Sequence, residues 1–214
     1  MKGFDYSKVK PEEPAYDKLR PLGKLITKMM YKIEYVGTEN IPAEGGFILA
    51  SNHVKALDPV YIALGVENRQ IYYMGKKELF ELPVVNKIFI KANGFPIVRG
   101  GADKEAIDYA ERVVKEGHIL GIFPEGTRSK DYKPARAKSG IGLIARESKA
   151  DILPVSIYNS DNMKKGTKLT IRFGEVIPYE KLGFTCDDSR EEVKNCAKFV
   201  MEEIVKLWSM GHCE

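Results

Sequence analysis

The chain has 214 residues, of which 43% are hydrophobic and 30% charged, a balance that predicts one folded domain with at most a small appendage. Its net charge of +4 is too small to indicate nucleic acid binding without a clustered basic patch. No uncharged apolar run approaches the roughly 20 residues of a membrane-spanning helix. The first residues lack the apolar core of a signal peptide, and three cysteines without metal-ligand spacing favour a reducing, cytosolic setting.

The N-terminal part is expected to form a polar arm followed by an amphipathic helix. Residues 1–14 are polar and contain two prolines, so we expect them to be a loose arm. From Leu19 to Ile33, apolar residues recur at helical steps, while Lys24, Lys28 and Lys32 form a stripe on another face. Such a helix can pack on the domain or lie in a membrane surface with its lysines on anionic headgroups. We therefore predict two parts: an N-terminal arm with an amphipathic membrane-surface helix at 1–34, and a globular domain at 35–214.

The rest of the chain alternates apolar runs typical of strands with periodic runs typical of helices. Strands are expected at 47–50, 71–74, 95–98, 119–123, 152–158 and 169–173. Helices are expected at 60–65, 78–89 with an interruption at Pro83, 103–116, 141–148 and 190–210. Several strands are apolar on both faces, as in a sheet covered on both sides. The pattern predicts an α/β fold: a single layered domain with a mostly parallel central sheet flanked by helices, plus the N-terminal amphipathic helix.

A candidate catalytic pair, His53 and Asp58, follows the apolar run at 47–50 directly. Histidine is the side chain whose usual pKa best suits proton transfer near neutral pH. A carboxylate on its far ring nitrogen would fix the tautomer and stabilise the imidazolium. The spacing also fits a structural alternative, in which the histidine caps a helix and the aspartate lies in its first turn. Two ligands without a third nearby make a poor metal site, so we expect no metal.

The other two histidines have structural interpretations. His118 follows Gly117, which is expected to end the 103–116 helix, so its charge would meet the helix dipole. His212 is one of the last three residues of the sequence, and we expect it to be disordered.

A second group of functional candidates begins at the end of the 119–123 strand, in Phe-Pro-Glu-Gly-Thr-Arg-Ser at 123–129. Gly126 lets backbone amides approach a ligand closely, Thr127 supplies a hydroxyl, and Arg128 supplies a planar fork suited to phosphate. The basic run continues with Lys130, Lys133, Arg136 and Lys138. Arg99 also lies at a strand end, and in open α/β sheets ligands gather beyond the carboxyl ends of strands. The structural alternative is a solvated basic loop.

These motifs resemble the glycerolipid acyltransferases, and among them the bacterial 1-acyl-glycerol-3-phosphate acyltransferases. Four blocks match in the order of that family, over about residues 35 to 175: His53 with Asp58, Gly-Phe-Pro-Ile-Val-Arg at 94–99, Phe-Pro-Glu-Gly-Thr-Arg-Ser at 123–129 and Leu-Pro-Val at 153–155. One position departs from the pattern. The family usually has Ser two residues after the His, where this chain has Lys55. That change could add a phosphate contact, and it leaves the head group of the acceptor open.

The resemblance implies transfer of a fatty acyl group from acyl-CoA or acyl-carrier protein to the hydroxyl of 1-acyl-glycerol-3-phosphate, giving phosphatidic acid for phospholipid biosynthesis. His53 would be the general base, and Asp58 would orient it and stabilise its charge. Lys76, Arg99 and Arg128 would hold the phosphate with help from Thr127, and Glu125 would order Arg128 or the loop. Backbone amides near Gly126 or the 153–155 block are candidate oxyanion donors. No cofactor is implied beyond the acyl donor as co-substrate.

The partners implied are a membrane lipid substrate, the acyl donor and the membrane surface, with no nucleic acid. The expected location is the cytoplasmic face of the cell membrane, as a peripheral, monotopic protein without a transmembrane span. Two alternatives stay open. One is the same chemistry on glycerol-3-phosphate or another lysolipid, and the other is a catalytically silent, membrane-associated lipid-binding homologue.

Overall fold

The computed structural model describes residues 4–9, 13–98, 103–162, 164–185 and 189–212. Its centre is a seven-stranded sheet with the order β1-β7-β6-β2-β5-β3-β4. The strands are β1 Tyr31–Val36, β2 Phe47–Ser51, β3 Ile71–Lys76, β4 Gly94–Ile97, β5 Ile119–Ile122, β6 Ile152–Tyr158 and β7 Thr167–Phe173. Five neighbours, β6-β2-β5-β3-β4, run parallel, and β7 pairs antiparallel with β6. The mostly parallel sheet predicted from the apolar runs is confirmed.

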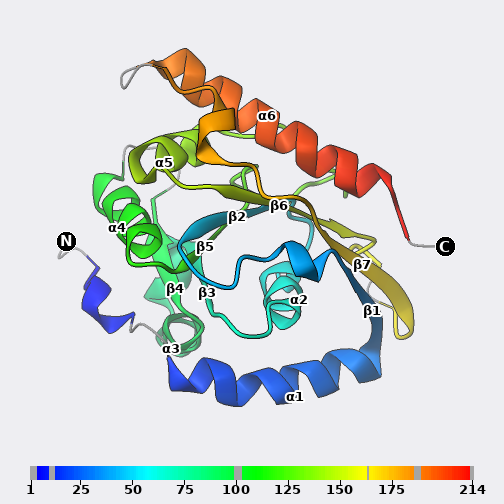
Figure 1. Ribbon diagram of the computed structural model, residues 1–214. Helices are drawn as coiled ribbons and strands as arrows, with labels where there is room; N and C mark the ends of the chain where they lie inside the picture. The colour runs from blue at the N-terminus through cyan, green and yellow to red at the C-terminus, as the bar shows by residue number, and fades with distance from the viewer. Residues whose placement is uncertain (1–3, 10–12, 99–102, 163, 186–188, 213–214) are drawn as a thin grey trace.

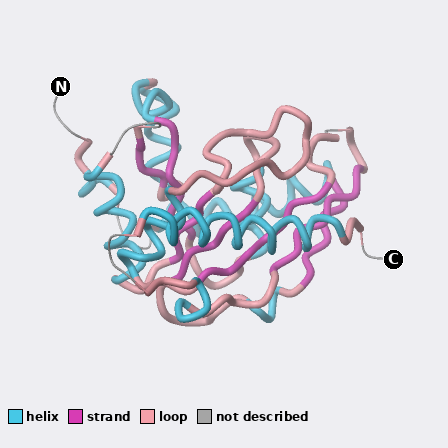
Figure 2. Tube along the Cα trace, turned by 90° about the horizontal axis from the view of Figure 1, so that it is seen from above, coloured by secondary structure: helices cyan, strands magenta, loops and turns pink. Residues whose placement is uncertain are grey.

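Helices cover both faces of this sheet (Figure 1). The α-helices are α1 Pro14–Met30, α2 Asp58–Gly65, α3 Pro83–Lys91, α4 Lys104–Lys115, α5 Gly140–Ser148 and α6 Arg190–Ser209. Short 3-10 turns occur at η1 Tyr6–Lys8, η2 Thr38–Asn40, η3 Lys77–Glu81 and η4 Tyr179–Leu182. α4, α5 and α6 lie on one face, and α2 and α1 lie on the other. Seen from above, α6 runs across the strands toward the C-terminus (Figure 2).

The alternation of side chains along β2 explains why the sheet has a core on each face. Phe47 and Leu49 pack into the cluster under α2, while Ile48 and Ala50 pack into the cluster under α4, α5 and α6. All four side chains are buried. Since successive side chains of a strand point to opposite faces, an uninterrupted apolar run is what a strand covered on both sides requires.

Strand β1 was not expected from the sequence, because Ile33 continues the helical period of the preceding segment. The structure ends α1 at Met30 and pairs β1 in parallel with β7. In Tyr31-Lys32-Ile33-Glu34-Tyr35, apolar and polar residues alternate, which is the period of a strand. The boundary expected at residue 34 therefore falls inside β1.

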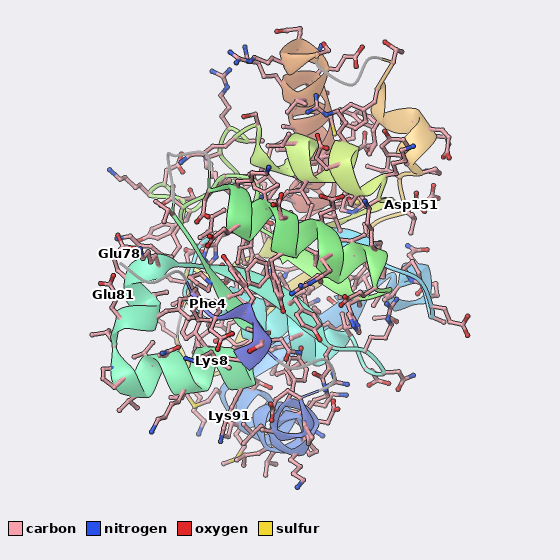
Figure 3. All side chains as sticks on the ribbon, turned by 90° about the vertical axis from the view of Figure 1, so that its left-hand side faces the viewer. Phe4, Lys8, Glu78, Glu81, Lys91 and Asp151 are labelled. Carbon is pink, nitrogen blue, oxygen red and sulfur yellow. The ribbon has the colours of Figure 1, made fainter. Side chains whose placement is uncertain are left out.

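The first residues that the structure describes pack on the domain, unlike the loose arm that we expected. Val9 is buried, the Tyr6 ring stacks on Tyr109 with centroids 4.7 Å apart, and Phe4 makes an edge contact with Phe80. Figure 3 shows this face, with Phe4 between η3 and α4. Phe4, Tyr6 and Val9 are the apolar side chains of this polar segment, and they are the ones that pack on the domain.

The helix α1 presents its apolar side chains to solvent. Its inner face is polar or small: Arg20 donates a hydrogen bond to the Arg69 carbonyl (2.8 Å), and Gly23 lies against Leu64 of α2. The outward side chains are Leu19, Leu22, Leu25, Ile26, Met29 and Met30, which are 39% to 66% exposed. Although α1 is amphipathic, its apolar face does not contribute to the core.

Candidate active site

His53 and Asp58 meet beyond the carboxyl end of β2. The Nδ1 atom of His53 lies 3.0 Å from Oδ2 of Asp58. The Asp58 side chain is fully buried, whereas the His53 side chain is 13% exposed. A buried carboxylate on Nδ1 favours the tautomer that leaves Nε2 without a proton, so Nε2 can accept one. The arrangement suits general base catalysis.

A tight bend between β2 and α2 brings the two side chains together. The same Oδ2 of Asp58 accepts hydrogen bonds from the backbone amides of Val54 (2.6 Å) and Lys55 (2.7 Å). Asp58 begins α2, and Pro59 follows it in the first turn, where a missing N–H costs nothing. Of the structural alternative from the sequence, the aspartate in the first turn is confirmed, whereas the N-cap of α2 is Leu57 and not His53. One carboxylate shapes the bend and holds the imidazole.

The 123–129 loop is attached to the backbone of His53 from two sides. Oε1 of Glu125 accepts a hydrogen bond from the His53 amide (2.9 Å), and the Ser129 amide donates one to the His53 carbonyl (2.8 Å). Glu125 is only 3% exposed. Its described partners are the backbone of His53 and that of Ala135, so of the two expected roles, ordering Arg128 or ordering the loop, its contacts fit the second. The two motifs therefore lie side by side, although His53 and Glu125 are 72 residues apart in the sequence.

Burial gives the Glu125 carboxyl an unusual protonation equilibrium. Removal from water is the main cause that raises its pKa to about 7, and the negative charges of Asp58 and Asp131 act in the same direction. The hydrogen bond from the His53 amide opposes the shift. Oε2 of Glu125 has no hydrogen-bond partner among the described residues. A carboxyl with a pKa of about 7 is neutral in a substantial fraction of molecules near neutral pH, unlike an exposed glutamate.

An aromatic stack supports the imidazole from behind. The His53 ring stacks on Phe123 with centroids 4.1 Å apart, and Phe123 stacks on Tyr73 at 5.8 Å. Gly121 makes room for this stack, because a Cβ there would lie 2.2 Å from the Tyr73 ring. The sequence did not reveal this support. A glycine within an apolar strand two residues before Phe123 was the available signal.

Gly126, Thr127 and Arg128 follow Glu125 at the surface of the loop. Gly126 has φ +67, a conformation that favours glycine, and its amide donates to the Phe123 carbonyl (2.9 Å). That amide is therefore occupied by the turn and is not a free oxyanion donor. The Lys138 side chain packs against Gly126, since a Cβ there would meet Lys138 Cδ at 3.0 Å. Thr127 and Arg128 are exposed, so both can reach a ligand.

Two further cations expected at the site have different outcomes. Lys76 lies at the end of β3, and its ammonium is 3.1 Å from the Glu78 carboxylate, with both side chains more than half exposed. Arg99 lies outside the described residues, although β4, which precedes it, ends beside β3 at the same edge.

The buried side chain of Asn52 joins the end of β2 to β6. Its amide donates to the Ile157 carbonyl (3.0 Å), and its Oδ1 accepts from the Ile157 amide (2.9 Å). This bridge fixes the residue before His53 to the strand that carries the 153–155 block. Sequence reasoning assigned no role to Asn52, because a polar residue after a strand is usually part of a turn.

Away from this site, His212 is held in place, unlike the disordered residue that we expected. Its Nδ1 lies 2.9 Å from the Thr170 hydroxyl, and its ring makes an edge contact with Tyr158. Within the described ranges, no group of three or more His, Cys, Asp or Glu side chains is placed to hold a metal ion. In the same part of the chain, no helix is long and apolar enough to cross a bilayer.

Comparison with known proteins gives consistent similarities. The family model described as Acyltransferase matches residues 32–158. A 1-acyl-sn-glycerol-3-phosphate acyltransferase of Bacillus subtilis (strain 168) is 30% identical over 188 residues, covering 86% of this chain and 92% of the relative. A relative with the same name from Borreliella burgdorferi is 30% identical over 186 residues, which cover 82% of this chain and 71% of the length of that relative. The crystal structure of the 1-acyl-sn-glycerophosphate (LPA) acyltransferase PlsC from Thermotoga maritima matches with a TM-score of 0.70 at 28% identity, covering 89% of this chain and 77% of that chain.

Proposed function

Because the chain belongs to the acyltransferase family, we propose that it transfers a fatty acyl group from a thioester to the free hydroxyl of 1-acyl-glycerol-3-phosphate, giving phosphatidic acid. The donor is acyl-CoA or acyl-carrier protein. The observation that carries the proposal is the 3.0 Å contact between His53 and Asp58, with the 123–129 loop hydrogen-bonded to the backbone of the same histidine.

In the proposed mechanism, Nε2 of His53 removes the proton of the acceptor hydroxyl while its oxygen attacks the thioester carbonyl. Asp58, charged and buried on Nδ1, stabilises the imidazolium that forms. The tetrahedral intermediate then collapses, the carbon–sulfur bond breaks, and the imidazolium returns its proton to the thiolate. No acyl-enzyme is required, because the thioester is already activated. A base of this kind typically contributes ~10²–10⁴ in rate.

We assign the phosphate of the acceptor chiefly to Arg128, with Arg99 and Thr127 assisting. Arg128 is exposed, lies in the loop that is anchored on His53 through Glu125 and Ser129, and makes no ion pair with another described residue. Lys76 contributes less in this proposal, since Glu78 already neutralises it. Glu125 is a positioning residue that acts through the His53 amide.

We also propose that α1 attaches the protein to the membrane that holds its lipid substrate. Six apolar side chains face outward from α1, and Lys18 and Lys28 are exposed on the same helix, whereas Lys24 pairs with Glu67 (2.7 Å). A helix with this arrangement can bury its apolar face among lipid headgroups while its lysines meet anionic lipids. The location that follows is the cytoplasmic face of the membrane, as a peripheral protein.

The test is an assay of the purified full chain with lysophosphatidic acid in anionic vesicles and either acyl-CoA or acyl-carrier protein. We expect phosphatidic acid to form. The acceptors glycerol-3-phosphate and monoacylglycerol, assayed in parallel, determine whether the acceptor class is correct. Tight binding of lysophosphatidic acid without turnover, with either donor, would instead identify a silent lipid-binding homologue.

A further inference from the structure

Lys55 is built into the same bend as the catalytic pair. Its backbone amide donates to Oδ2 of Asp58 (2.7 Å), the atom that also contacts His53 (3.0 Å). The backbone of Lys55 is therefore fixed with respect to the imidazole. This is the position at which the resemblance leads us to expect a serine.

The Lys55 ammonium is held by an aromatic ring. Its Nζ lies 4.9 Å from the centroid of the Tyr132 ring. A ring face attracts an ammonium group without neutralising it, whereas a carboxylate would cancel its charge. Lys76 illustrates the second case, because Glu78 pairs with it. No salt bridge of Lys55 occurs within the described parts of the chain, so its positive charge remains available to an anion.

Tyr132 is presented to Lys55 by a loop whose two ends are anchored at the active site. The Ser129 amide binds the His53 carbonyl (2.8 Å), and the Lys138 amide binds the Pro124 carbonyl (2.8 Å). At the tip, Tyr132 has φ +65, a conformation that is unfavourable for a bulky residue. The ring is nonetheless 48% exposed, so burial of the ring does not explain the conformation. The conformation instead places the Tyr132 ring against the Lys55 ammonium.

We propose that Lys55 binds the phosphate of the acceptor and that Tyr132 positions its ammonium group for this purpose. The inference rests on the proposed function and deepens it. In a glycerol phosphate, the phosphate is separated from the reacting hydroxyl by a few bonds, so it must lie close to His53. A lysine on the bend that carries His53 meets this condition. The added charge favours a phosphate monoester over a phosphodiester or an uncharged acceptor.

Substitution of Lys55 by Gln tests the proposal through KM and kcat measured separately. We expect Lys55→Gln to raise the KM for lysophosphatidic acid roughly ten-fold, because a hydrogen bond to a charged group is lost. kcat should stay within about two-fold, because the base is intact. The KM for monoacylglycerol, which has no phosphate, should not change. Tyr132→Leu should raise the KM for lysophosphatidic acid less than Lys55→Gln does, and Tyr132→Phe should leave it near the wild-type value.

The matched control is Lys133→Gln, which removes one positive charge from the same loop beside Tyr132. It should leave the KM for lysophosphatidic acid nearly unchanged. A Lys55→Gln enzyme with the wild-type KM, or with an equal effect on both acceptors, would overturn the proposal. So would an equal effect of Lys133→Gln.

Equilibrium binding of a short-chain lysophosphatidic acid to wild type and Lys55→Gln separates this inference from the proposed function. Weaker binding by the variant supports the role of Lys55 even if the wild type does not turn the ligand over. In that case the proposed function fails and the phosphate site stands. Equal binding by both proteins removes Lys55 from the site whatever the activity.

Discussion

The Asp58 carboxylate has two roles that two substitutions can separate. Its Oδ2 accepts hydrogen bonds from the amides of Val54 and Lys55 and contacts Nδ1 of His53. In Asp58→Asn, an amide oxygen can still accept from the same groups, so the bend is retained while the negative charge is lost. In Asp58→Ala, both the charge and the acceptor are lost.

The expected magnitudes follow from burial. At an effective dielectric constant of about 20, unit charges about 4 Å apart attract by ~4 kcal/mol, which corresponds to roughly 10³ in rate. We therefore expect Asp58→Asn to lower kcat by ~10²–10⁴. Its loss of stability should be modest, about 1–2 kcal/mol. Asp58→Ala leaves two backbone amides without an acceptor, at about 1–3 kcal/mol each, so its free energy of unfolding should also fall by roughly 2–6 kcal/mol.

The measurements are the rate of phosphatidic acid formation and the midpoint of urea unfolding for both variants. An Asp58→Asn enzyme that folds normally and retains kcat within about three-fold of wild type would refute the reasoning, since general base catalysis with a charged partner predicts ~10² or more. Asp58 would then only shape the turn into α2.

Three other variants test separate parts of the proposal. Arg128→Ala should raise the KM for lysophosphatidic acid roughly ten-fold or more with little change in stability; unchanged KM and kcat would remove Arg128 from the site. Leu22→Asp with Met29→Asp should reduce sedimentation with anionic vesicles while the Tm stays within a few degrees, because both side chains are exposed. Met210→Asp, at an exposed position on the far side of the sheet, is the control, and undiminished binding by the α1 double variant would assign docking to another surface. For Glu125→Gln the prediction concerns pH. Since folding raises the pKa of the Glu125 carboxyl from 4.5 to about 7, ionisation destabilises the wild type increasingly as pH rises through that interval. The variant should match the wild type near pH 4 and exceed its free energy of unfolding by roughly 1–3 kcal/mol near pH 8; a pH-independent difference in urea titrations would contradict this.

The parts of the structure that were predictable from the sequence are those with a strong local signal. The uninterrupted apolar run before His53 identified β2, and Asp103 correctly marked the start of α4, where its side chain accepts from the Ala106 amide. The family resemblance given by the four motifs is also confirmed. In each case, residues close together in the sequence are enough to predict the feature.

Features that depend on distant residues were not predictable. β1 is a strand because β7 lies beside it, and its alternating pattern was hidden by the helical period that Ile33 continues. The outward apolar face of α1 likewise depends on what the domain leaves uncovered, since the same periodicity describes a core helix. At the site, the contact of Glu125 with the His53 amide joins two loops that are far apart in the sequence, so only the fold could reveal it.

We propose above all that His53 is the base in a site shared with the 123–129 loop. The most direct test is phosphatidic acid formation by His53→Ala at saturating lysophosphatidic acid, with its unfolding midpoint measured beside the wild type. The account predicts a folded protein whose turnover falls by ~10² or more. A folded His53→Ala enzyme with near-normal turnover would contradict it.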